Sequence, residues 1–286
     1  MSRIKRGWQL SKKSWSLLNG HRELLRFPLY GALATIPLTL IFLGPGVYLL
    51  DQDVYGGAIP LLVLGIYVLS VVATFFGVGL AAAADMIFRG EQATVGDGIA
   101  VARARFTQIC GWAAISTAIS VLMGVLENQG GIAGTIAARL VGMAWSLITF
   151  IAVPVIAIEG TGAFGTLKRS ASLFRERWGQ QITGNIAIGG AVFLFGMLPA
   201  AALIVAGVLV WASAGFVGAL LVVLGAIGFA IALLVAKALS GIFGVALYRY
   251  AIDGQPVGGF TAEELESAVK PKGGRNAPPT ATPGTV

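Results

Sequence analysis

The chain has 286 residues, of which 56% are hydrophobic and 12% are charged, and its mean hydropathy is +0.83. Soluble domains carry about 25% charged residues, so a water-soluble globule is excluded, and the apolar content excludes disorder over most of the length. Lys and Arg outnumber Asp and Glu by 20 to 13, a formal charge of +7 that we expect to face anionic lipid rather than nucleic acid.

Residues 1–28 are expected to form a cytoplasmic amphipathic segment. Wound at about 100° per residue, Arg3–Leu18 places two tryptophans on an apolar side and four basic residues on the other side. Tryptophan suits the headgroup boundary, and each basic residue there contributes about 1 kcal/mol with anionic lipid. The alternative is a helix packed on its own protein. The candidate lipid contacts are Lys5, Arg6, Trp8, Lys12, Lys13 and Trp15.

The middle of the chain, residues 29–252, is predicted to be an all-α domain of six transmembrane helices. A helix that crosses about 30 Å of hydrocarbon needs about 20 apolar residues. The apolar runs cover 29–50, 58–88, 109–126, 140–158, 182–211 and 216–236, and the last continues as a weakly polar extension to 251. Residues 253–286 are expected to be a cytoplasmic tail, with a short helix begun by a capping box of Thr261 and Glu264 and then disorder.

The distribution of basic residues predicts the orientation of these spans. Eighteen of the 20 Lys and Arg residues lie on the side of the N-terminus, whereas the links 51–57, 127–138 and 212–215 contain none. Basic residues favour the cytoplasmic side, so both termini are expected in the cytoplasm.

The links before the third and fifth spans repeat the amphipathic pattern of the N-terminal segment. Apolar residues fall at i, i+4, i+7 and i+11 from Val95 and again from Leu167, an offset of 72 residues. The N-terminal segment joins them through Lys12–Leu18, which matches Lys168–Phe174, so three degenerate units are indicated. We therefore predict cytoplasmic-side amphipathic helices before spans 1, 3 and 5. The candidate lipid contacts in these two links are Arg103, Arg105, Lys168, Arg175, Arg177 and Trp178.

Three ionisable residues are expected near the cytoplasmic boundary of the bundle, where they could meet. Asp85 ends the second span, Glu159 ends the fourth and Lys237 lies late in the sixth. Ionisable groups at membrane depth are costly, so this candidate intramembrane polar site indicates ion, proton or headgroup binding. The alternative is that Lys237 snorkels to the interface and pairs with one carboxylate to lock helix packing.

Other features bear on transport and catalysis. Pro45, between Gly44 and Gly46, is expected to break or kink the first span, and broken helices line substrate sites in transporters. Cys110 and His21 are the single cysteine and histidine, so they cannot build a metal site, and no nucleophile elbow or phosphate-binding loop occurs. We expect no enzyme activity, no cofactor and no metal.

Several motifs resemble an uncharacterised prokaryotic family of integral membrane proteins, a domain of unknown function. They are Gly7–Trp15, Glu23–Pro28, Val153–Gly160, Leu167–Ser170 and Trp178–Gly179. The resemblance implies a six-span plasma-membrane protein and carries no established activity. More distantly, residues 159–178 are similar in style to the membrane domain fused to some glycerophosphodiester phosphodiesterases. That similarity implies a lipid-facing role, but the chain has no room for their catalytic barrel.

Two functions follow from these patterns. The first is a non-enzymatic, multi-pass plasma-membrane protein that engages anionic lipid of the inner leaflet, as a membrane-organising protein or accessory subunit. The alternative is a small-molecule or lipid transporter with a polar site near its cytoplasmic mouth, which requires a continuous polar cavity. Two alternatives for a protein partner are a second copy of this chain and another membrane subunit. Nucleic acid is not expected as a partner.

Overall fold

The computed structural model describes residues 16, 18–129, 131–178, 196–211, 214–262 and 265, and their regular structure is helical. The elements in chain order are η1 (Arg22–Leu25), α2 (Arg26–Asp51), α3 (Tyr55–Phe88), α4 (Val95–Ala104), α5 (Phe106–Gln129), α6 (Gly131–Ile158), α7 (Ala163–Trp178), α9 (Leu198–Val210) and α10 (Gly215–Asp253). The predicted all-α class is therefore confirmed for this part of the chain. Most of the N-terminal segment and of the tail lies outside the described residues, as does the start of the expected fifth span.

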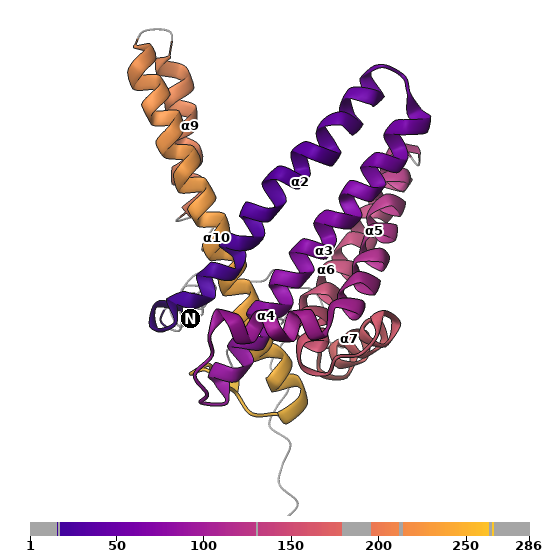
Figure 1. Ribbon diagram of the computed structural model, residues 1–286, viewed down its shortest axis with the longest axis vertical. Coiled ribbons are helices and arrows are strands. Elements are labelled where there is room, and N and C mark those ends of the chain that lie inside the picture. The colour runs from indigo at the N-terminus through magenta and orange to yellow at the C-terminus, as the bar shows by residue number, and fades with distance from the viewer. Residues whose placement is uncertain are drawn as a thin grey trace, which may run out of the picture.

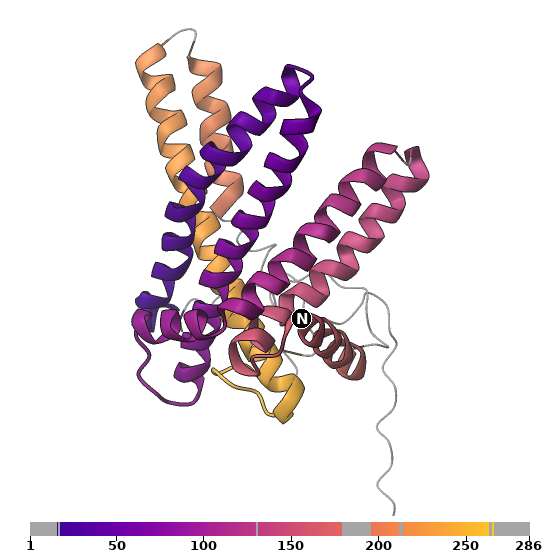
Figure 2. The same cartoon turned by 45° about the vertical axis from the view of Figure 1, so that its right-hand side comes forward.

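Three helical hairpins dominate the architecture: α2 with α3, α5 with α6, and α9 with α10. They converge at one end, where α4 and α7 lie, and they diverge toward the other end (Figure 1). The view in Figure 2 shows the α5/α6 hairpin leaning away from α2/α3 as well. We call the end that carries α4 and α7 the inner end, and the opposite end the outer end.

Four of the helical segments are long and apolar enough to cross a membrane. They are Arg22–Asp51, Tyr55–Phe88, Phe106–Asn128 and Gly215–Asp253, and shorter apolar helical stretches cover Ile148–Ile158 and Leu198–Val210. The expected break in the first span does not occur, because α2 runs as one helix through Pro45. Close packing against α3 supports this part of α2, where Gly46 lies directly against Leu62.

The hydrophobic core lies at the inner end, and we call it the base. It is built from Val78–Ala84 of α3, Ile151–Ala157 of α6 and Ala238–Ala251 of α10. Helix α4 crosses this core at a point of close backbone approach, since Gly98 faces Gly79 of α3 and the ring of Phe27. Glycine at both positions lets the two helix backbones touch.

The α9/α10 hairpin is held by glycines of its own. Gly207 of α9 faces Gly218 of α10, and Gly225 of α10 lies against the backbone of Ala200 and Ile204. This hairpin therefore packs as a closely paired unit, and α9 packs chiefly along α10.

Helix α4 begins with a complete capping box, which predicts a pH-dependent helix start. The Thr94 side chain accepts a hydrogen bond from the Asp97 backbone, and Asp97 accepts bonds from the Thr94 hydroxyl and backbone N–H. The Thr94 hydroxyl first, and then its N–H, hold the pKa of Asp97 below its ordinary value of 3.8.

The pKa of Asp97 is lower in the folded protein than in the unfolded chain. Its contribution to stability is therefore complete above about pH 4 and is lost as the pH falls through the pKa of the folded state. We expect the hydrogen-exchange protection factor at the start of α4, the intrinsic rate at each pH divided by the observed rate, to fall below pH 4 in the wild type. In Asp97→Asn, the protection factor should already be low at pH 7 and change little with pH. An equal acid response in both proteins would contradict this role.

Candidate functional site

Asp85 is a buried carboxylate held by two arginines at the inner end. Its residue is 5% exposed, and Arg249 of α10 donates to both carboxylate oxygens, at 2.7 and 3.0 Å. Arg89, the residue directly after α3, places its Nε atom 3.4 Å from an Asp85 carboxylate oxygen. Two further carboxylates extend this network. A Glu91 oxygen lies 2.9 Å from a guanidinium nitrogen of Arg89, and an Asp253 oxygen lies 3.6 Å from a guanidinium nitrogen of Arg249. The chain of alternating charges thus joins α3 to α10.

Glu159, directly after α6, forms a second cluster. It accepts hydrogen bonds from Arg169 of α7, at 2.9 and 3.2 Å, and from the Tyr248 hydroxyl of α10, at 2.9 Å. The hydrogen bond to Glu159 raises the pKa of the Arg169 guanidinium. Tyr248 and Arg249 are neighbours in sequence, so two consecutive residues of α10 hold the other two hairpins at the inner end.

Lys237 does not join the two carboxylates. It is exposed on α10, and it has no ion-pair partner among the side chains that the structure describes. Arg249, 12 residues further along, pairs with Asp85 instead. The sequence reasoning missed Tyr248 and Arg249 as a site. The available signal was a polar pair in the last turns of a long apolar helix, with Asp253 four residues after Arg249.

Both clusters lie beyond the band of exposed apolar side chains. On α10 this band runs from Phe216 to Leu233, Lys237 follows, and most residues from Ala238 to Ala251 are buried in the base. On α2 the band begins at Leu29, just after the charged Arg26. The carboxylates therefore belong to the base.

The apolar faces of α4 and α7 are turned toward the protein. On α4, Ala102 is fully buried, and Val95 and Ile99 pack against the core. On α7, Leu167 packs against the core and Leu173 is 3% exposed. For these two helices the contacts favour packing on the protein itself. The side chains of Phe174, Arg177 and Trp178 lie outside the described part.

Exposed cations of α4 and α7 lie near exposed aromatic residues in the sequence. Phe164 is 79% exposed and lies one turn before the exposed Lys168, and Phe106 is 51% exposed and lies three residues after the exposed Arg103. Arg175 is exposed further along α7. Within the described ranges Arg103, Lys168 and Arg175 have no carboxylate partner, whereas Arg89, Arg169 and Arg249 are paired. Arg105 instead packs its guanidinium against Gly160.

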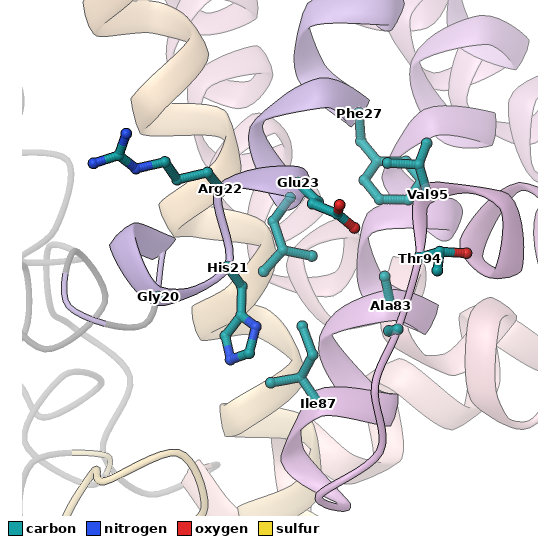
Figure 3. A pocket seen from close by; sticks show the side chains of 11 residues that line it. Gly20, His21, Arg22, Glu23, Phe27, Ala83, Ile87, Thr94 and Val95 are labelled. Atoms are coloured by element: carbon teal, nitrogen blue, oxygen red, sulfur yellow. The ribbon is translucent and has the colours of Figure 1, made fainter.

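A cavity of about 220 Å³ opens between η1 and the link from α3 to α4 (Figure 3). Leu24, Phe27 and Val95 are among its apolar lining residues. Among its polar lining residues, Thr94 bonds Asp97 and Arg22 bonds Asn19, and His21 and Glu23 line it as well. A wider neighbouring recess of about 490 Å³ shares His21 and Ile87. Neither of these two cavities is lined by Asp85, Glu159 or Lys237.

The four helical segments that are long and apolar enough to cross a membrane place the protein in the class of α-helical membrane proteins. The chain belongs to a family of unknown function, DUF6159, whose model matches residues 55–259. This match supports the resemblance to an uncharacterised family. No curated protein matches the chain.

Proposed function

We propose that this protein is a six-span, multi-pass protein of the plasma membrane with both termini in the cytoplasm. The base lies on the cytoplasmic side and binds anionic lipid headgroups of the inner leaflet. In this role the protein is a non-enzymatic, membrane-organising protein or accessory subunit. The observation that carries the proposal is the set of exposed cations that lie three or four residues from exposed rings, Lys168 after Phe164 and Arg103 before Phe106.

Charge and hydrophobic insertion act together when such a surface meets a membrane. A ring that is exposed next to a cation can enter the headgroup boundary while the cation stays at the phosphates. Each basic residue near an anionic surface contributes about 1 kcal/mol. Arg103, Lys168 and Arg175 together therefore contribute up to about 3 kcal/mol, which is about a hundredfold in affinity.

The test measures lipid retained by the full-length protein in native mass spectrometry, with phosphatidylglycerol and phosphatidylcholine of the same acyl chains. The variant Arg103→Gln/Lys168→Gln/Arg175→Gln should lose its preference for phosphatidylglycerol. The charge-preserving control Arg103→Lys/Arg175→Lys should keep it, and so should Arg139→Gln. An unchanged preference in the triple variant would overturn the lipid proposal.

The second candidate is a small-molecule or lipid transporter. The observation that favours it is the charge network, which joins the hairpins at the inner end while they diverge at the outer end (Figure 1). The same mass spectra separate the two functions, because a transporter should retain a small molecule or lipid that is lost in Asp85→Asn or Glu159→Gln. Retention that depends only on the cations of α4 and α7 would favour the first function.

A further inference from the structure

Lys237 lies where α10 leaves the band of exposed apolar side chains and enters the base. Phe216, at the start of that band, is 84% exposed. The interval from residue 216 to residue 237 rises about 32 Å at 1.5 Å per residue. The hydrocarbon core of a bilayer is about 30 Å thick. With Phe216 at the outer boundary of the hydrocarbon, Lys237 is therefore at the inner boundary.

The contacts between helices place Lys237 at the same level independently. Gly241, one turn after Lys237, lies against Leu80 of α3, and the neighbouring Gly79 lies against Phe27 of α2. Phe27 is in the first turn of α2, where the charged start of that helix meets its apolar band. Lys237 is thus within about one or two turns of the inner end of the apolar band on both helices.

The acidic residues of the base do not neutralise Lys237. Arg249, which holds Asp85, lies 12 residues further along α10, about 18 Å along the helix axis. Among the residues that the structure describes, no carboxylate forms an ion pair with Lys237. Lysine near the end of a span extends its ammonium to the headgroup level, where the phosphates of phospholipids are the abundant anions.

A strip of exposed residues leads from Lys237 along α10 toward the outer end. Leu233, Ala230, Ala226 and Val223 precede Lys237 by 4, 7, 11 and 14 residues, so at 100° per residue all four lie within about 40° of one line along the helix. Each is exposed, Leu233 by 43% and Val223 by 53%. The two alanines make the strip shallow, and its length of about 21 Å exceeds one leaflet of hydrocarbon, about 15 Å.

We propose that Lys237 and this strip form a phospholipid site, in which the Lys237 ammonium binds the lipid phosphate and an acyl chain lies along Ala230 and Ala226. An anionic lipid is the expected class, because its headgroup carries no cation that competes with Lys237. The strip gives a lipid apolar contact that a soluble anion does not use. The site is separate from the cations of α4 and α7, and only its assignment to the inner leaflet rests on the proposed function.

The test uses the full-length protein in nanodiscs and a phosphatidylglycerol probe with a photoreactive diazirine on one acyl chain, and mass spectrometry locates the adducts. We expect adducts along residues 223–233, which Lys237→Gln should reduce about fivefold, the effect of one basic residue at an anionic surface. Lys237→Arg should retain them. Adducts at Leu40 of α2, which is 69% exposed, report general lipid contact and should be equal in all three proteins. Undiminished strip adducts in Lys237→Gln would overturn the proposal.

Two further arms separate this site from a soluble anion and from the surface of α4 and α7. Inorganic phosphate, added at constant ionic strength, should leave the strip adducts unchanged, and their loss would assign Lys237 to a soluble anion and contradict the lipid site. Arg103→Gln/Lys168→Gln/Arg175→Gln should also leave them unchanged, whether or not it abolishes the preference for phosphatidylglycerol. Loss of the strip adducts in this triple variant would contradict a separate site at Lys237.

Discussion

Replacing Arg249 by alanine is expected to cost about 3 kcal/mol of unfolding free energy. The change leaves the buried carboxylate of Asp85 with only Arg89, at 3.4 Å, in place of the two bonds from Arg249. Breaking a buried ion pair by removing one partner typically costs about 3 to 5 kcal/mol, because the remaining charge stays desolvated. Thermal or denaturant unfolding of the purified protein in detergent measures the effect.

The control for this prediction removes both charges. Arg249→Met/Asp85→Leu should recover much of the lost stability, because apolar residues of similar volume can replace a buried pair. Arg103→Ala, at an exposed arginine without a carboxylate partner in the described ranges, should change stability by less than about 0.5 kcal/mol. Equal losses in Arg249→Ala and Arg103→Ala would show that the Asp85 pair does not hold α3 to α10.

Replacing Gly98 by alanine is the second change with a large expected effect. A Cβ atom at this position would lie 2.5 Å from the Gly79 oxygen and 2.5 Å from the Phe27 ring, so α4 must move away from α3. Overpacking of this kind costs about 1 to 3 kcal/mol, and here the obstructing atom is backbone, which cannot rotate aside.

Gly96 supplies a matched control in the same helix. A Cβ atom there meets only the Thr94 hydroxyl, at 3.5 Å, which is ordinary contact. Gly96→Ala should therefore be neutral, or should stabilise α4 by up to about 1 kcal/mol through helix propensity. The test compares the free energies of unfolding of the two variants. If Gly98→Ala is as stable as Gly96→Ala, the close approach of α3 and α4 is refuted.

Hydropathy and charge were enough to predict the helical class and the position of most long helices. Apolar runs of about 20 residues carry that information locally, and the second run, 58–88, differs from α3 by three residues at its start. The link helices were also predicted near α4 and α7, because their apolar residues repeat at helical spacing. Which surface those faces cover depends on tertiary packing: Val95, Ile99, Ala102 and Leu167 pack in the protein's own core. Phe106, the last residue of the first predicted face, instead begins α5 and is 51% exposed.

The charge pairing was harder to predict, because it depends on helix register. Asp85 and Glu159 were singled out as the acidic ends of two spans, and both lie in the base. Their cation was expected at Lys237, but Arg249 is the residue at the level of Asp85, since α10 continues as one helix to Asp253. Hydropathy ends the last apolar run at 236 and extends it only as a weakly polar stretch to 251, so it does not single out Tyr248 and Arg249 as partners of the carboxylates.

The most direct test of a cytoplasmic base is labelling of single cysteines in intact cells with a membrane-impermeant maleimide, in the Cys110→Ser background. Gln52, between α2 and α3, and Gln92, between α3 and α4, are exposed at opposite ends of α3. The account predicts that a cysteine at Gln52 reacts in intact cells, whereas one at Gln92 reacts only after the cells are permeabilised. Labelling at Gln92 in intact cells, with protection at Gln52, would contradict it.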